Sequence, residues 1–212
     1  MSAYAIAAGT HGAVPKLSTI IVVLKNANIR YSFRQLAPLT TYDSGVPPDS
    51  ALLFHFQSDL VMKFSMHSHC AGSERVPPHI LEEVIAAAEA VDVRIERGAA
   101  PRIRDQFVAT LRLKGWSSEV TVSRGSDMGI TSMRENIGLC LQTGNMARMY
   151  ADLMKLQALY LNDAIQAAVF VLPAQPVALA IGDNIAQAAR LERELEIFRK
   201  VFYVPTLIVA LE

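Results

Sequence analysis

Hydrophobic and polar positions predict a β-rich beginning of the chain. Residues 18–25 (STIIVVLK) form a β-branched run typical of a buried strand. Residues 26–50 are rich in Asn, Thr, Ser, Asp and Pro, which favour a loop. Residues 51–69 contain stretches that alternate with period two, and these predict a pair of strands. We therefore expect residues 1–62 to be a β-rich N-terminal extension, and the pattern gives it no role.

Further along, helical and strand patterns alternate. Runs of apolar and β-branched residues predict strands over residues 119–123, 136–142, 165–172 and 206–211. Apolar residues recur at helical spacing in four other segments: Leu81, Val84, Ile85 and Ala88; Ile103, Phe107, Val108 and Leu111; Met146, Met149, Leu153, Leu156 and Tyr160; Leu191, Leu195, Phe198 and Val201. This alternation predicts an α/β fold in which helices cover one mixed sheet.

Composition narrows the class of protein. The chain has 212 residues, and Lys plus Arg and Asp plus Glu both total 20, so there is no overall basic charge of the kind many nucleic-acid-binding proteins carry. A local basic face remains possible. Two distant cysteines, Cys70 and Cys140, favour a reduced, cytoplasmic protein without a disulfide framework. No apolar run is long enough for a membrane span, and the first residues do not resemble a signal peptide.

The predicted strand at residues 136–142 ends in residue types that suit chemistry. Cys140 and Gln142 share one face of it, and Asp127 lies in a turn before it. If neighbouring strands bring Asp127 to that face, its carboxylate, a strand carbonyl and water would suit Mg²⁺. Asp127 could instead satisfy backbone N–H groups of its turn. Gln142 could hold a water or a phosphate oxygen, or it could end the edge of the sheet.

Two other motifs permit a functional and a structural interpretation. Thr143, Gly144 and Asn145 could contact nucleic acid, or they could form an ordinary loop that caps the next helix. His67, His69 and Cys70 are close enough in sequence to suggest zinc, but no further ligand motif accompanies them.

Residues 127–173 resemble the core of the BglII/BstYI-type restriction endonucleases, a branch of the PD-(D/E)XK nucleases. In that family an Asp precedes an apolar strand containing Glu-x-Gln, and a small residue, a helix and a buried strand ending in Leu-Pro follow. The matching landmarks here are Asp127, Gln142, Gly144-Asn145 and Leu172-Pro173. Weaker likenesses extend over residues 63–212. The resemblance implies that these residues form a restriction-endonuclease-like domain, with a mixed β-sheet flanked by helices.

The same resemblance implies a type II site-specific deoxyribonuclease that hydrolyses double-stranded DNA with Mg²⁺ and acts as a homodimer. Asp127 and Cys140 would then stand at the metal site, and Gln142 would position a water or the metal. The backbone at residues 140–141 would complete the metal shell, and residues 143–145 would contact DNA.

Two departures from the family pattern affect this expectation. Cys140 stands where the family carries Glu, and Arg104 stands where it tends to carry Asn. A thiol is a poor ligand for Mg²⁺, which prefers hard oxygen donors. Glu135 and Glu83 are other possible donors.

Two alternative functions remain open. One is a DNA-binding relative that no longer cuts because Cys140 replaced the acid. The other is a structural or interaction protein that kept only the α/β core, for which the neutral net charge is a mild argument.

Overall fold

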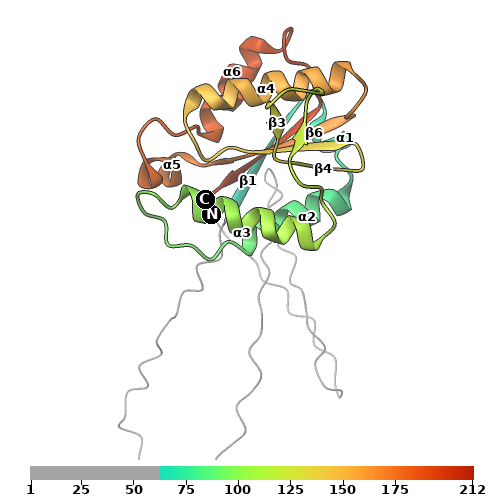
Figure 1. Ribbon diagram of the computed structural model, residues 1–212. Helices are drawn as coiled ribbons and strands as arrows, with labels where there is room; N and C mark the ends of the chain where they lie inside the picture. Colours follow the sequence, from blue (N-terminus) through green and yellow to red (C-terminus); the bar gives the residue numbers. More distant parts are fainter. Residues whose placement is uncertain (1–62) are drawn as a thin grey trace, which may run out of the picture. The chain divides into compact units, whose positions relative to one another are not determined.

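The computed structural model describes residues 63–212, which form a five-stranded sheet between two layers of helices (Figure 1). The three central strands are parallel, and the edge strands β1 and β4 are antiparallel to their neighbours. In spatial order the strands are β1 (Phe64–His69), β7 (Thr206–Leu211), β6 (Ala167–Pro173), β5 (Ile137–Leu141) and β4 (Ser132–Arg134). This arrangement confirms the predicted mixed sheet flanked by helices. The strands expected before residue 63 lie outside the described residues.

Residues 63–212 contain all four predicted helices, together with two shorter ones. The helices are α1 (Gly72–Arg75), α2 (Pro78–Glu89), α3 (Ala100–Leu113), α4 (Met146–Leu161), α5 (Gln175–Ile181) and α6 (Ala188–Phe198). The hydrophobic pattern did not predict α1 and α5, because four and seven residues are too few to display a clear helical period. No helix within residues 63–212 is long and apolar enough to cross a membrane.

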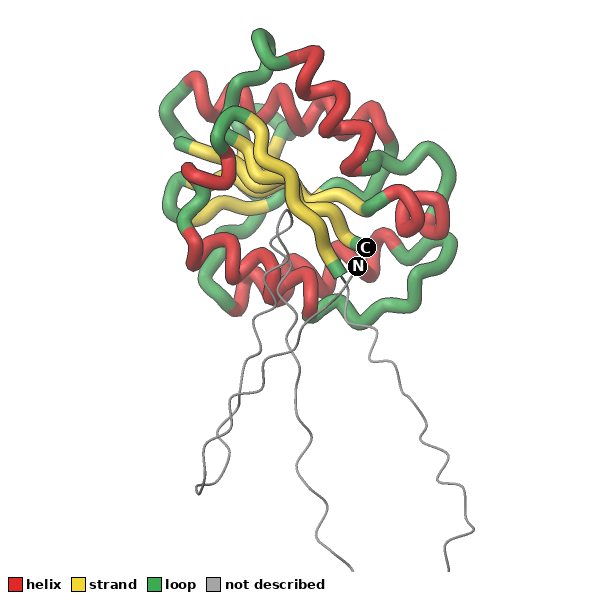
Figure 2. The backbone as a smooth tube through the Cα atoms, turned by 180° about the vertical axis from the view of Figure 1, so that it is seen from behind, coloured by secondary structure: helices red, strands yellow, loops and turns green. Residues whose placement is uncertain are grey.

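Successive side chains of the central strands point to opposite faces of the sheet, and each face has its own hydrophobic core. On β5, Leu139 and Leu141 pack with α2 and α3, whereas Cys140 points into the opposite core with α4 and α6. Strands β6 and β7 alternate in the same way. Figure 2 shows these strands enclosed by helices on both sides. Side chains of β5 are therefore buried on whichever face they point to.

A small hairpin adjoins the sheet at the β4 edge. Its strands, β2 (Val120–Thr121) and β3 (Gly129–Ile130), are antiparallel and form a separate two-stranded sheet. The predicted strand at residues 119–123 is thus only two residues long, because the chain turns back through residues 123–128.

The predicted fourth helix ends before the last residue of its apolar pattern. Leu191 and Leu195 lie on α6 and are buried, whereas Phe198, its last residue, is 39% exposed and Val201, beyond the helix end, is 61% exposed. The apolar stripe therefore continues past the core and reaches the surface.

We predict that Gly72→Ala lowers the free energy of unfolding by about 1–3 kcal/mol, the usual range for overpacking. A Cβ atom at residue 72 would lie 2.2 Å from the backbone carbonyl carbon and oxygen of Thr206 on β7, and this backbone cannot move independently. Gly182→Ala is the control, because its Cβ would meet only the flexible Ile185 side chain at 3.3 Å. Urea denaturation of both variants tests the prediction, which fails if the two lose equal stability.

Candidate functional site

Strand β5 fixes the position of Cys140 and removes it from solvent. Cys140 is 1% exposed and packs in the core beneath α4 and α6. Burial raises the pKa of its thiol well above the usual value, and the negative charge of nearby Asp152 raises it further. The thiol therefore stays neutral at physiological pH, a form that does not bind metal ions.

Thr131, rather than Asp127, lies beside Cys140. The antiparallel pairing of β4 with β5 matches Ser132 with Leu139, so the next pair in this register is Thr131 with Cys140. A hydrogen bond of 3.0 Å from the Leu141 N–H to the Thr131 hydroxyl oxygen holds the two segments together. Thr131 is only 9% exposed. Sequence reasoning missed this residue because the exact register of a short edge strand cannot be read from its pattern.

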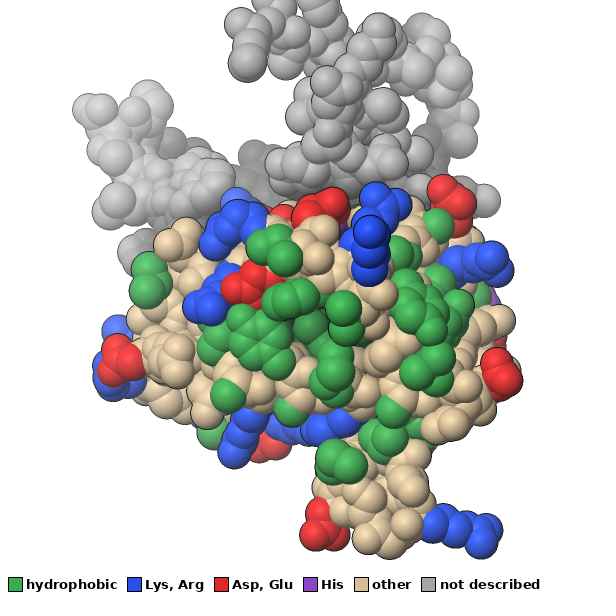
Figure 3. Space-filling model, turned by 90° about the horizontal axis from the view of Figure 1, so that it is seen from above, with side chains coloured by type: hydrophobic (Ala, Val, Ile, Leu, Met, Phe, Trp, Pro, Cys, Tyr) green, Lys and Arg blue, Asp and Glu red, His purple; other side chains and the backbone are tan. Residues whose placement is uncertain are grey.

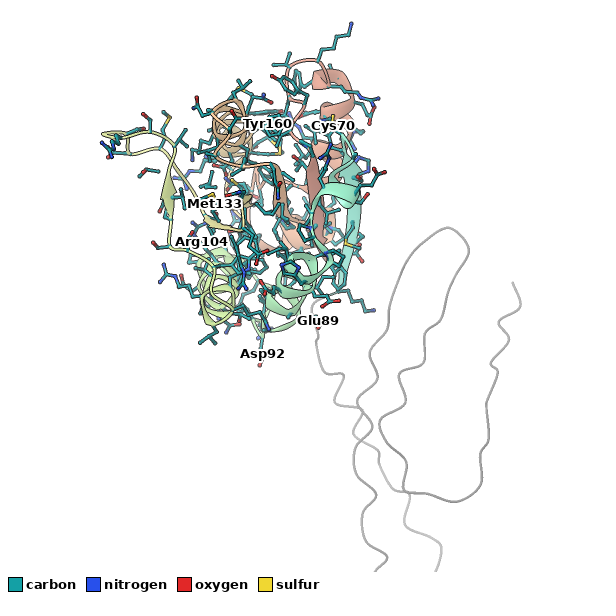
Figure 4. All side chains as sticks on the ribbon, turned by 90° about the vertical axis from the view of Figure 1, so that its right-hand side faces the viewer. Cys70, Glu89, Asp92, Arg104, Met133 and Tyr160 are labelled. Atoms are coloured by element: carbon teal, nitrogen blue, oxygen red, sulfur yellow. The ribbon has the colours of Figure 1, made fainter. Side chains whose placement is uncertain are left out.

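The structure does not bring Asp127 to Cys140 and Gln142. Asp127 is exposed on the turn of the β2–β3 hairpin, where the Met128 N–H donates to the Ser126 hydroxyl. Figure 4 shows this hairpin projecting from the sheet. The expectation assumed that the strand before Asp127 pairs directly with the strand at residues 136–142, whereas β2 pairs with β3 and β5 pairs with β4. The chain instead forms β3 and β4 in succession, and these hold Asp127 at a distance.

Gln142 has both ends of its amide engaged within the protein. Its Nε2 donates to Asp152 Oδ2 at 2.7 Å, and its Oε1 accepts from the Gly144 N–H at 2.8 Å. Asp152 in turn accepts from Lys155 Nζ at 2.9 Å. Gln142 therefore joins the loop after β5 to helix α4 through its two hydrogen bonds. This is a structural role, the alternative to holding a water or a phosphate oxygen. Asp152 was missed in the sequence, although an acid between the buried positions Met149 and Leu153 was a detectable signal.

Residues 143–145 form the loop that leads into α4, and this loop bonds to the segment before α6. The Asn145 side chain caps the helix, with its Oδ1 accepting from the Arg148 N–H at 3.1 Å. The Ala186 N–H donates to the Gly144 carbonyl. Thr143 is buried, whereas Asn145 is exposed. Of the three residues proposed for DNA contact, Asn145 presents the most accessible side chain.

The other acids considered from the sequence are engaged elsewhere. Glu83 accepts from Trp116 Nε1 at 2.8 Å and pairs with Arg134. Glu135 lies in the β4–β5 turn and pairs with His79 at 2.9 Å, an interaction that lowers the pKa of its carboxyl group. This turn is at the opposite end of β5 from Gln142, roughly 17 Å away at about 3.3 Å per residue.

Arg104 reaches the end of β5 from helix α3. Its Nη1 donates to the Leu141 carbonyl oxygen at 3.0 Å. Figure 4 shows Arg104 between α3 and the strand that carries Met133. A surface groove of about 520 Å³ opens here, and charged or polar side chains contribute to its lining: Arg104, Asp105, Arg112, Glu119 and Thr131. Arg104, which stands where the family tends to carry Asn, therefore lies at the candidate site itself.

These residues do not fit a Mg²⁺ site. The ion needs several hard oxygen ligands, usually including one or two carboxylates. Beside the Leu141 carbonyl stand the Thr131 hydroxyl and the neutral Cys140 thiol, and Arg104 already bonds to that carbonyl. Within residues 63–212 no three His, Cys, Asp or Glu side chains are grouped closely enough to hold a metal ion.

The zinc hypothesis also lacks support from the geometry. His69 is buried, and its Nε2 lies 2.9 Å from the Phe202 carbonyl oxygen and 3.3 Å from Cys70 Sγ. The pairing of β1 with β7 confirms that His67 and His69 share one face. His69 is nevertheless part of the core, stacked on the Phe202 ring.

Comparison with known proteins identifies the family. A search of curated proteins finds no match. Among solved structures, restriction endonuclease BglII complexed with a DNA 16-mer superposes with a TM-score of 0.62 at 12% identity, covering 71% of this chain and 78% of that chain. Free BglII gives a TM-score of 0.52 at 14% identity, covering 71% and 80%. The family model for restriction endonuclease BglII/BglIII matches residues 64–211, and the chain therefore belongs to this restriction endonuclease family.

Proposed function

We propose that this protein binds specific sites in double-stranded DNA, and that its Mg²⁺-dependent cleavage is impaired. The family and the fold are those of site-specific DNA endonucleases. Restriction endonucleases of this kind generally use a divalent metal ion. The observation that carries the proposal is the lack of an acid beside the Leu141 carbonyl, where the described residues place Thr131, Cys140 and Arg104, with Arg104 bonded to that carbonyl.

The case for DNA as the partner rests on the retained fold. The similar BglII structure contains a DNA 16-mer. Binding to phosphates makes affinity depend on salt, whereas hydrogen bonds to base edges give specificity. Asn145 is our candidate for base contact. Its exposed side chain lies at the N-cap of α4, and of its two amide atoms only Oδ1 takes part in capping. Thr143 and Gly144 would support the loop.

Mg²⁺-dependent hydrolysis of double-stranded DNA is the second candidate function. Family membership favours it, and so does one carboxylate close to the site. Continuing the β2–β3 register by one residue places Glu119 opposite Thr131, and both line the groove beside Arg104. An acid at this position could take the place of the carboxylate that Cys140 lacks.

We also propose that the protein is a homodimer, joined through an apolar surface on α4 and α6. Figure 3 looks onto this side and shows hydrophobic side chains gathered there. The large exposed apolar residues of these two helices and of the segment after α6 are Met154, Leu161, Ile197, Phe198, Val201 and Tyr203. Extended exposed apolar surface is uncommon on monomers.

A second copy is the occupant that suits this surface. A two-fold dimer matches the symmetry of a palindromic DNA site. Helix α4 begins directly after the loop at residues 143–145, so contact between two α4 helices would set the spacing between the two loops.

We expect the wild-type protein to bind duplex DNA in low salt but to leave supercoiled and linear DNA uncut with Mg²⁺ or Mn²⁺. BglII under the same conditions is the positive control, and gel electrophoresis is the readout. Cleavage by purified protein would favour the second candidate. Glu119→Gln and Asp127→Ala would then show which carboxylate is required, because only loss of a true ligand abolishes the cutting.

Replacing Asn145 should separate capping from DNA reading. Asn145→Ala removes both functions, so we expect a stability loss of about 0.5–2 kcal/mol and a specificity loss of about 1–3 kcal/mol. Asn145→Ser keeps a capping oxygen and should lose specificity alone. The preferred site is first selected from a random duplex library, and affinities for that site and for random DNA are then compared beside a thermal melt. An unchanged specificity ratio in both variants would make Asn145 a cap only.

Ile197→Glu should convert the dimer to a monomer without unfolding it. Ile197 is 76% exposed, so the charge costs little in the monomer but is buried when two copies meet. Leu113→Glu on α3, at a residue 89% exposed, is the matched control and should stay dimeric. Sedimentation velocity measures both. A wild-type protein that sediments as a monomer at every concentration contradicts the proposed dimer.

A further inference from the structure

Arg104 bonds to the backbone carbonyl that a metal ion at the end of β5 would need. The Leu141 carbonyl oxygen is the strand carbonyl that would join a metal shell between residues 140 and 142. Arg104 Nη1 lies 3.0 Å from that oxygen. A guanidinium carries one positive charge and five N–H donors, so a single bond to Leu141 leaves four donors for another acceptor.

Arg104 has no ion-pair partner among residues 63–212. The residues beside it at the end of β5 are Thr131 and Cys140, and neither is an acid. Asp152, the buried acid behind Gln142, is already paired with Lys155. Asp105 and Glu119 line the same groove, but within residues 63–212 neither forms an ion pair with Arg104.

Two other arginines among the described residues show the contrast. Arg102, two residues earlier on α3, pairs with Glu96 at 2.7 Å, and Arg134 on β4 pairs with Glu83. These cations serve the fold by neutralising a neighbouring acid. Arg104 is instead held by a backbone carbonyl and faces an open groove of about 520 Å³ that Arg112 also lines.

A phosphate diester is the ligand that fits these features. It is singly charged, and arginine binds phosphate through two parallel hydrogen bonds. We infer that Arg104 binds a DNA backbone phosphate at the place where a metal ion bound to the Leu141 carbonyl would stand. This inference rests on the proposed DNA-binding function, and it makes that binding independent of divalent metal.

The test compares Arg104→Gln, Arg104→Lys and the control Arg102→Gln with the wild type. Fluorescence anisotropy measures affinity for a labelled duplex over a range of salt concentrations, once with EDTA and once with Mg²⁺ at matched ionic strength. Thermal melts confirm that each variant is folded. If Arg104→Gln does not fold, the Lys variant carries the comparison, because it keeps the charge and loses only the planar fork.

We expect Arg104→Gln to bind about 10-fold more weakly, as loss of a charge-assisted hydrogen bond predicts. Its salt slope should fall by about 0.9, the value for one phosphate contact. Arg104→Lys should lie between it and the wild type, and Arg102→Gln should match the wild type. Exchanging EDTA for Mg²⁺ should leave the affinity of the wild type unchanged.

Three results would overturn the inference, and only the last of them also contradicts the proposed function. In the first, Arg104→Gln binds DNA with the affinity and salt slope of the wild type; if only Arg104→Lys folds, that variant is compared instead. Arg104 then holds no phosphate, although the proposed DNA binding stands. If Mg²⁺ strengthens binding at matched ionic strength, a metal ion takes part and the guanidinium has not replaced it. If the wild type binds no duplex even in low salt, both the inference and the proposed function are wrong.

Discussion

The burial of strand β5 on both faces is the constraint on which the candidate site depends. Parallel pairing with β6 and antiparallel pairing with β4 fix the strand between two cores, so residue 140 can point only into the core under α4 and α6. An ionised acid at that position would need a metal ion or a cation to offset the cost of burial. A thiol needs neither, because burial keeps it neutral. The strand is thus stable without a metal ion.

The same constraint explains the roles of the neighbouring polar groups. Gln142 points to the same side as Cys140 but lies at the strand end, where its amide joins Asp152 on α4 to the Gly144 N–H. Thr131 offers a hydroxyl oxygen that accepts from the Leu141 N–H. These bonds satisfy buried polar atoms within the protein. Arg104 then supplies a positive charge to the groove at this edge of the sheet.

The sequence predicted the long elements of this fold well, because their hydrophobic periods are set by burial. Helix α4 and strands β5, β6 and β7 lie within a residue or two of their predicted positions. The elements that were missed or misjudged are short: α1, α5 and the β2–β3 hairpin carry too few residues for a period. The prediction of the site depended on the β2–β3 hairpin, which carries Asp127. The hairpin holds Asp127 away from Cys140. The register of β4 against β5 places Thr131 beside Cys140 instead, and this register could not be read from the spacing of a motif.

Binding of Mn²⁺ to the protein–DNA complex, measured by electron paramagnetic resonance against the same DNA alone, tests whether the end of β5 can hold a metal ion. We expect equal Mn²⁺ uptake by the complex and by free DNA, because Thr131, Cys140 and Arg104 leave no carboxylate-lined site at the Leu141 carbonyl. One additional Mn²⁺ per protein chain, lost in Glu119→Gln, would contradict this expectation and show that a displaced acid restores the metal site.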